Sequence, residues 1–277
     1  MIRPHSRPAT GKAVIALGAG LLLISLAFVG GFRHSLARAG RVPVPPSSAN
    51  RLSALPRTIV WAWERPEDLR FLPAGRVGVS FLAETVTLSG GTVNVRPRLN
   101  SLRVAPGTPL VACARIEVDS GHPPALSSDQ MAVASAAIAS MTNLAGIAAV
   151  QVDFDATVFE RAFYAGLLRD LRRRLPSGMP LSMTALASWC MDDRWIAGLP
   201  VDEAVPMLFQ MGPDAADVRV LLAQGRDFSL PVCRESVGIS TDEPIRNLPP
   251  GRRRYVFSPK GWSPSALNAL LAKERPR

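Results

Sequence analysis

Two carboxylates stand at the end of one strongly apolar segment. Residues 148–155 read Ala-Ala-Val-Gln-Val-Asp-Phe-Asp. Side chains alternate along an extended strand, so Gln151, Asp153 and Asp155 share one face. Apolar runs flank the segment, which predicts a strand buried on both faces. Buried carboxylates are costly unless they are paired, hydrated or used. The mouth of a parallel barrel resolves this conflict, because the last inward residues of a strand meet solvent there.

The neighbouring predicted strands carry more polar and aromatic groups near the same ends. The strand over 109–118 offers Arg115 and Glu117 on one face. The other candidates for contact with a ligand are, in chain order, Trp63, Ser182, Thr184, Ser188, Trp189, Gln210, Ser258, Lys260 and Trp262. Carboxylates and an arginine beside aromatic faces are typical of a sugar-binding cleft. Three structural alternatives stay open: Asp153 as a hydrogen-bonded structural carboxylate, Arg115 paired with Glu117, and Trp189 packed beneath a helix.

The elements that must position these groups alternate between strands and helices. We expect strands over 58–63, 76–88, 109–118, 148–155, 180–189, 202–211, 231–240 and 254–258, and helices over 128–144, 157–175, 191–197, 215–224 and 263–273. A hairpin should follow Gly90 and Gly91. Eight βα units predict an α/β fold, a (β/α)8 TIM-type barrel. An open doubly wound sheet is the alternative, weakened because no Gly-rich phosphate loop follows the first strand.

The N-terminal region has the pattern of a membrane anchor. Residues 13–32 form an uncharged run of twenty residues, long enough to span a bilayer. We therefore divide the chain into a basic N-terminus with a transmembrane anchor or signal (1–41), a Pro/Ser-rich linker (42–57) and the barrel domain (58–277). The expected location is the bacterial inner membrane, single-pass, with the domain in the periplasm. Secretion after cleavage near residues 37–39 is the alternative.

The formal net charge of +10 does not indicate a nucleic-acid partner. Residues 1–41 hold six Lys or Arg and no acidic residue, which leaves only +4 on the remainder. A weakly basic domain without a Lys/Arg-rich stripe is a poor candidate for binding DNA or RNA. The expected contacts are instead the membrane, through residues 13–32, and a carbohydrate or cell-envelope glycan.

Histidine and cysteine usage limits the possible chemistry. His5 and His34 flank the membrane segment, so the barrel domain (58–277) has a single histidine, His122, which argues against Ser-His-Asp, Cys-His and multi-histidine metal sites. We expect no metal and no cofactor. A metal-dependent hydrolase built on Asp153, Asp155 and Glu117 is a third alternative. The cysteines at 113, 190 and 233 lie in apolar runs, so we expect buried thiols rather than a disulfide.

Three segments resemble a bacterial family known as domain of unknown function 3142. They are VQVDFDATVFERAFYAGLLRDLRRRLP, PLSMTALASWC and LPVDEAVPMLFQMG, which together span residues 151–212. Weaker similarity extends from about residue 57 to about residue 265. The resemblance implies an exported barrel protein, and the family has no established activity to transfer.

The strand ending at Asp155 also resembles the fourth barrel strand of chitinase-like glycoside hydrolases, which ends in Asp-x-x-Asp-x-Asp-x-Glu. Asp153 and Asp155 match the second and third acidic positions of this pattern. Val150 occupies the position of the first aspartate, and Thr157 occupies the position of the glutamate. That glutamate donates the proton to the leaving group, so an acid would have to come from elsewhere, with Glu117 or Glu84 as candidates.

The resulting functional prediction is an exported, membrane-tethered barrel that binds a glycan. In its hydrolytic version, Asp155 is the base, nucleophile or orienting carboxylate, Asp153 holds it, and Glu117 is the acid. Arg115, Trp63, Trp189, Gln210, Lys260 and Trp262 would contact the sugar. The alternative is a non-catalytic envelope scaffold or a glycan-binding barrel that has lost its acid, which Thr157 favours.

Overall fold

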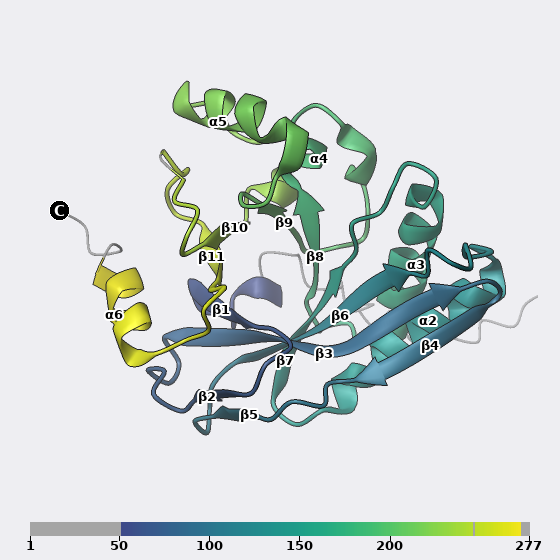
Figure 1. Cartoon of the computed structure of the whole chain (residues 1–277), viewed down its shortest axis with the longest axis horizontal. Coiled ribbons are helices and arrows are strands. Elements are labelled where there is room, and N and C mark those ends of the chain that lie inside the picture. Colours follow the sequence, from purple (N-terminus) through teal and green to yellow (C-terminus); the bar gives the residue numbers. More distant parts are fainter. Residues whose placement is uncertain (1–50, 246, 273–277) are drawn as a thin grey trace, which may run out of the picture. The chain divides into compact units, whose positions relative to one another are not determined.

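Eight parallel strands close into a barrel in the computed structural model, which describes residues 51–245 and 247–272 (Figure 1). The barrel strands are β1 (Thr58–Ala62), β3 (Val77–Ser89), β6 (Leu110–Val118), β7 (Ile147–Asp153), β8 (Leu181–Leu186), β9 (Glu203–Met207), β10 (Ser236–Ser240) and β11 (Arg253–Phe257). Closure is explicit in the pairing, since β1 is parallel to β3 on one side and to β11 on the other. The TIM-type α/β fold is therefore confirmed, and the open sheet is excluded.

Helices cover the barrel unevenly. The longer helices are α2 (Ser128–Ser140), α3 (Arg161–Arg174), α5 (Ala215–Ala223) and α6 (Pro264–Ala272), and α4 (Ala187–Met191) is a short one. Helix α3 forms because Phe163, Tyr164, Leu167, Leu168 and Leu171 repeat at helical spacing and are all buried against the sheet. In the described residues, the connections after β1, β3 and β10 contain no α-helix, so the barrel departs there from a regular (β/α)8 pattern.

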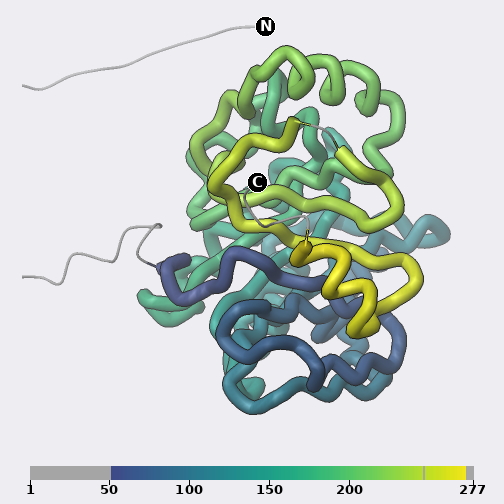
Figure 2. The backbone as a smooth tube through the Cα atoms, turned by 90° about the vertical axis from the view of Figure 1, so that its left-hand side faces the viewer, coloured from purple at the N-terminus to yellow at the C-terminus, as the bar shows by residue number. Residues whose placement is uncertain are grey.

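Two small β-elements replace helices on the side of β1 and β3. Strand β4 (Thr92–Pro97) returns antiparallel to β3, as the predicted hairpin requires. Strands β2 (Glu67–Leu69) and β5 (Leu102–Val104) form a separate parallel pair. Helix α6 packs against this region through Leu267 and Leu270, which share a buried cluster with Leu69 and Leu72. In Figure 2 the yellow helix α6 lies beside the dark blue part of the chain, so segments near the two ends of the described chain are neighbours.

The floor of the barrel is filled by residues that precede β1. Leu52 and Leu55 are buried in one cluster with Tyr255. Two carbonyls of the same segment, Leu52 O and Pro56 O, accept hydrogen bonds from the guanidinium of Arg253, which also pairs with fully buried Glu203 at 2.8 Å. Residues 51–56 of the predicted linker therefore pack as part of the barrel.

The cysteine prediction is wrong. Cys190 and Cys233 form a disulfide with a Cα–Cα distance of 5.9 Å, and Cys113 is the free, buried cysteine. The bond joins α4 to the turn η4 (Pro231–Cys233) across 43 residues of chain. Apolar surroundings alone did not reveal it, because the pairing depends on which elements the closed barrel brings together.

The predicted anchor, residues 13–32, lies outside the described residues. Among residues 51–272, no helix has the length and hydropathy that crossing a bilayer requires.

Candidate functional site

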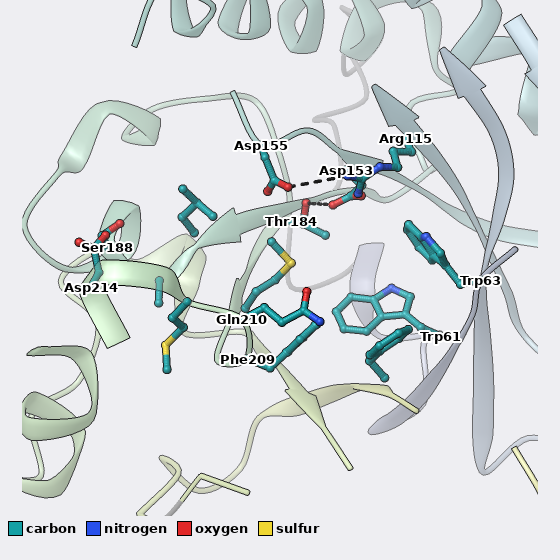
Figure 3. Close-up of a pocket in the computed structure, with 15 residues that line it drawn as sticks. Trp61, Trp63, Arg115, Asp153, Asp155, Thr184, Ser188, Phe209, Gln210 and Asp214 are labelled. Atoms are coloured by element: carbon teal, nitrogen blue, oxygen red, sulfur yellow. Dashed lines mark hydrogen bonds and ion pairs between the residues drawn. The ribbon is translucent and has the colours of Figure 1, made fainter. Parts of the chain in front are cut away.

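One cavity opens at the mouth formed by the carboxyl ends of the strands. Its volume is about 220 Å³. Its lining comes from six strand ends and comprises Trp61, Trp63, Arg115, Asp153, Asp155, Thr184, Leu186, Ala187, Ser188, Met207, Phe209, Gln210, Met211, Asp214 and Phe257. The C-terminal mouth is where barrels of this architecture hold their functional groups. In Figure 3 the two tryptophans lie on one side of the cavity and Asp214 on the other, with Asp155 and Gln210 between them.

Asp153 is held rigidly at the base of this cavity. Alternation along β7 directs it inward, and it is only 3% exposed. Its Oδ1 accepts a hydrogen bond from Thr184 Oγ1 on β8 at 2.7 Å, and its Oδ2 accepts one from Arg115 Nη1 on β6 at 2.7 Å (Figure 3). The strand register explains both bonds, because Arg115 and Asp153 are direct neighbours across β6 and β7. Both oxygens are satisfied, so Asp153 acts as a positioning group within the site.

Arg115 links three carboxylates. Besides Asp153, its Nε donates to Glu117 Oε1 at 3.2 Å, and its Nη2 lies 4.0 Å from Asp155 Oδ2. The three predicted acids are thus gathered at one end of the barrel around one guanidinium. The Arg115–Glu117 pairing that the sequence left open is present, and Arg115 also binds Asp153.

Asp155 is the accessible carboxylate. Its side chain is 52% exposed, and it follows β7 by two residues. Desolvation in the cavity raises the pKa of Asp155 above its ordinary value, and the neighbouring charge of Asp153 raises it further, while Arg115 acts in the opposite direction. A carboxylate in an open cavity with a raised pKa is suited to exchanging a proton or a hydrogen bond with a ligand.

The layer beneath the cavity fixes the aromatic wall. Gln151 is fully buried, and its Oε1 accepts hydrogen bonds from Trp61 Nε1 and Ser80 Oγ, each at 3.0 Å. Its Nε2 donates to Ser182 Oγ at 3.0 Å. Because every polar atom of the Gln151 amide group is engaged across four strands, the indole of Trp61 has one defined orientation. Phe209 then packs edge-on against Trp61 and stacks on Phe257.

Gln210 enters the cavity from a strained backbone. Its φ angle is +50°, a conformation that non-glycine residues rarely adopt. The carboxylate of Glu243 accepts its backbone N–H at 3.2 Å, which holds the turn after β9. Backbone strain of this kind is retained mainly where the surrounding structure fixes a functional conformation. The side-chain amide of Gln210 consequently faces the cavity (Figure 3).

Two groups of lining residues were not among the sequence candidates. Asp214 ends the turn η3 (Gly212–Asp214), which follows β9. Within the described residues, its carboxylate has no hydrogen-bonded or ionic partner. Its place in a loop after a barrel strand is a signal that could have identified it. Phe209 and Phe257 extend the aromatic wall, and no spacing pattern in the sequence distinguishes them from ordinary core residues.

Six candidates from the sequence lie outside the cavity lining. Two are serines with other partners: Ser182 Oγ accepts from Gln151, and Ser258 Oγ donates to the carbonyl of Gly261. Glu117 accepts a hydrogen bond from Arg115 but is not part of the cavity lining. Trp189 is 2% exposed and packs edge-on against Trp195, because α4 begins at Ala187 and turns it away from the mouth. Trp262 is 8% exposed and donates from Nε1 to the carbonyl of Trp61 at 3.0 Å. Lys260 is exposed outside the lining.

The alternative acid, Glu84, lines a separate cavity of about 10 Å³ beside Arg96 and Arg98. Thr157, at the glutamate position of the chitinase-like pattern, is exposed, and its backbone N–H donates to Glu160 Oε2 at 2.6 Å. The described residues contain no group of three His, Cys, Asp or Glu side chains placed to hold a metal ion.

Comparisons with known proteins give one distant structural likeness. No family model matches the chain, and no curated protein matches its sequence. A search of solved structures found the crystal structure of a candidate chitinase A from Streptomyces coelicolor, with a TM-score of 0.48 and 9% sequence identity. The match covers 77% of this chain and 95% of that one.

Proposed function

We propose that this protein is a glycan-binding barrel whose cavity receives a sugar unit. The observation that carries the proposal is the combination of walls in one open cavity: indole and phenyl rings on one side, and carboxylates and an amide on the others. Sugar rings present apolar C–H faces and a rim of hydroxyls, which aromatic faces and polar acceptors match respectively. Arg115, Thr184 and Gln151 keep these groups in place, so the site is preformed.

An exported location is part of the proposal. The disulfide between Cys190 and Cys233 supports it, because such bonds persist mainly in oxidising compartments. The apolar run at residues 13–32 is consistent with a tether to the membrane from which the barrel domain extends. A cell-envelope glycan is then the ligand within reach.

A glycan array tests the proposal directly. The purified barrel should retain a defined subset of glycans, and Asp155→Asn should weaken that binding because it removes the accessible carboxylate. Asp129→Asn, an exposed change in the first turn of α2, is the matched control and should leave the profile unchanged. An array without any bound glycan would refute the proposal, and identical profiles for wild type and Asp155→Asn would remove Asp155 from the site.

Glycoside hydrolysis is a second candidate, favoured by the raised pKa of Asp155, which suits a proton donor. Hydrolysis generally uses two carboxyl groups across the scissile bond. Asp153 is already occupied by two hydrogen bonds, so Asp214 is the lining residue that could supply the second group. Binding without product release across a broad glycan panel would eliminate the hydrolase and leave the binding protein.

A further inference from the structure

The cavity carries an excess of negative charge. Its lining contains three carboxylates, those of Asp153, Asp155 and Asp214, and one guanidinium, that of Arg115, which leaves a net formal charge of −2. Two acids outside the lining are paired, Glu64 with Arg96 and Glu243 with Arg219. Glu117 shares Arg115 with Asp153 and adds a further negative charge beside the cavity.

The single guanidinium of the lining is not free to receive an anionic ligand. Its Nη1 is bonded to Asp153, its Nε to Glu117, and its Nη2 faces Asp155. An acidic sugar would have to displace one of these carboxylates while facing the repulsion of the others. Acidic glycans are thus disfavoured at this site.

Two carboxylates remain for a ligand. Asp155 has only the 4.0 Å approach of Arg115, and the carboxylate of Asp214 has no ionic partner among the described residues. In Figure 3 Asp214 lies across the cavity from the indoles of Trp61 and Trp63, and Asp155 lies between them. A cation beside an aromatic face gains from the electron density of the ring as well as from the carboxylates.

We infer that the sugar bound here is an amino sugar with a free, protonated amine. The Asp155 carboxylate would hold the ammonium group, Asp214 would add negative potential from across the cavity, and the aromatic wall would hold the apolar face of the ring. This inference rests on the proposed glycan binding and narrows it to glycans that carry unacetylated amino groups. Neutral glycans would lose the ionic contacts, and acidic ones would be repelled.

Matched tetrasaccharides test this specificity. The β-1,4-linked tetramers of glucosamine and glucose differ at C2 by an ammonium group in place of a hydroxyl, and a β-1,4-linked glucuronic acid tetramer adds the opposite charge. Titration calorimetry of the folded barrel should show the glucosamine tetramer binding at least about tenfold more tightly than the glucose tetramer. The glucuronic acid tetramer should bind least, and added salt should reduce the preference.

Variants identify the groups responsible. Asp155→Asn and Asp214→Asn should each reduce the preference for glucosamine, and the double variant should abolish it while the glucose tetramer still binds. Asp129→Asn changes the net charge equally at a distance and should keep the preference. Equal affinity for the two tetramers in wild type, or a preference that survives in the double variant, overturns the inference and leaves glycan binding intact. Failure to bind any glycan in the array ends both proposals.

Discussion

Arg115 Nη1 donates to Asp153 Oδ2 at 2.7 Å, and this ion pair joins β6 to β7 directly beneath the cavity. The carboxylate is almost fully buried, whereas the guanidinium side chain is 35% exposed. The intact pair contributes little net stability, because its attraction is offset by the cost of taking both charges out of water. Breaking it leaves a buried carboxylate oxygen without a donor, which is the larger effect.

Arg115→Gln should therefore lower the free energy of unfolding by about 1–3 kcal/mol. Asp153→Asn should also destabilise, because the neutral amide loses the charge that pairs with the Arg115 guanidinium. The double variant should lose less unfolding free energy than the sum of the losses in the two single variants. Urea unfolding of the wild type, both single variants and the double variant gives the coupling energy between Arg115 and Asp153. Arg70→Gln is the matched control, since Arg70 pairs with Asp68 at the surface and its loss should change little. Strictly additive losses of unfolding free energy would contradict the proposed coupling between Arg115 and Asp153.

Glu84 predicts a pH-dependent change in stability. It is 8% exposed, its Oε1 has no hydrogen-bond partner, and burial raises its pKa from 4.5 to about 6. The folded state holds this proton more tightly than the unfolded state, so the contribution of Glu84 to stability is greatest below pH 4.5 and is lost as pH rises through about 6. Above that pH the charged carboxylate opposes folding by about 2 kcal/mol, at 1.36 kcal/mol per pKa unit.

Glu84→Gln removes that charge with little change in shape. The variant should gain up to about 2 kcal/mol at pH 8 and almost nothing at pH 4, as measured by urea unfolding at both values. Glu235→Gln, an exposed change beside β10, serves as the control and should show no such pH-dependent gain. A uniform effect of Glu84→Gln at both pH values would show that the carboxyl titrates normally.

Reduction of the disulfide should destabilise the barrel. The bond closes a loop with a sequence separation of 43, for which chain entropy gives about 4 kcal/mol. Reductant should lower the Tm of the wild-type protein, and Cys190→Ser/Cys233→Ser should begin at that lower Tm. The double variant keeps Cys113, so a Tm unaffected by reductant assigns the response to the disulfide. An unchanged wild-type Tm after complete reduction would contradict this prediction.

The barrel could be predicted from the sequence because its signals are local. Runs such as residues 58–63 and 109–118 are β-branched and apolar, and helices with their own caps or apolar faces separate most of them. Alternation along β7 alone placed Asp153 deep and Asp155 at the mouth. The same reasoning anticipated Arg115 near these carboxylates, because parallel neighbours in a closed sheet keep their phase.

Other parts of the site depend on contacts that local patterns do not encode. The predicted strand over 180–189 ends at Leu186, and the start of α4 there takes Trp189 out of the cavity. Glu117 has the same phase as Arg115 on β6, but it pairs with Arg115 and is not part of the cavity lining. Asp214 reaches the cavity through a three-residue turn, and neither that turn nor the Cys190–Cys233 bond follows any periodicity.

Asp155 also predicts how ligand binding varies with pH. Three ionic groups line the cavity with Asp155. The charge of Asp153 helps to raise the pKa of Asp155, and the charge of Arg115 opposes that rise. Asp214 lies across the cavity. An ammonium group binds the ionised carboxylate, so affinity for the glucosamine tetramer should rise as pH increases through the pKa of Asp155, above the ordinary value of 3.8. By linkage, the bound cation should lower that pKa and release protons at pH values near it.

Calorimetry in two buffers of different ionisation enthalpy measures this proton release. Wild type should release protons on binding the glucosamine tetramer, and Asp155→Asn should release fewer and lose part of the acid limb of the affinity profile. The glucose tetramer has no ammonium group and supplies the matched comparison, because its binding should release almost none. An acid limb of equal size for both tetramers would mean that Asp155 senses the sugar hydroxyls and not a positive charge.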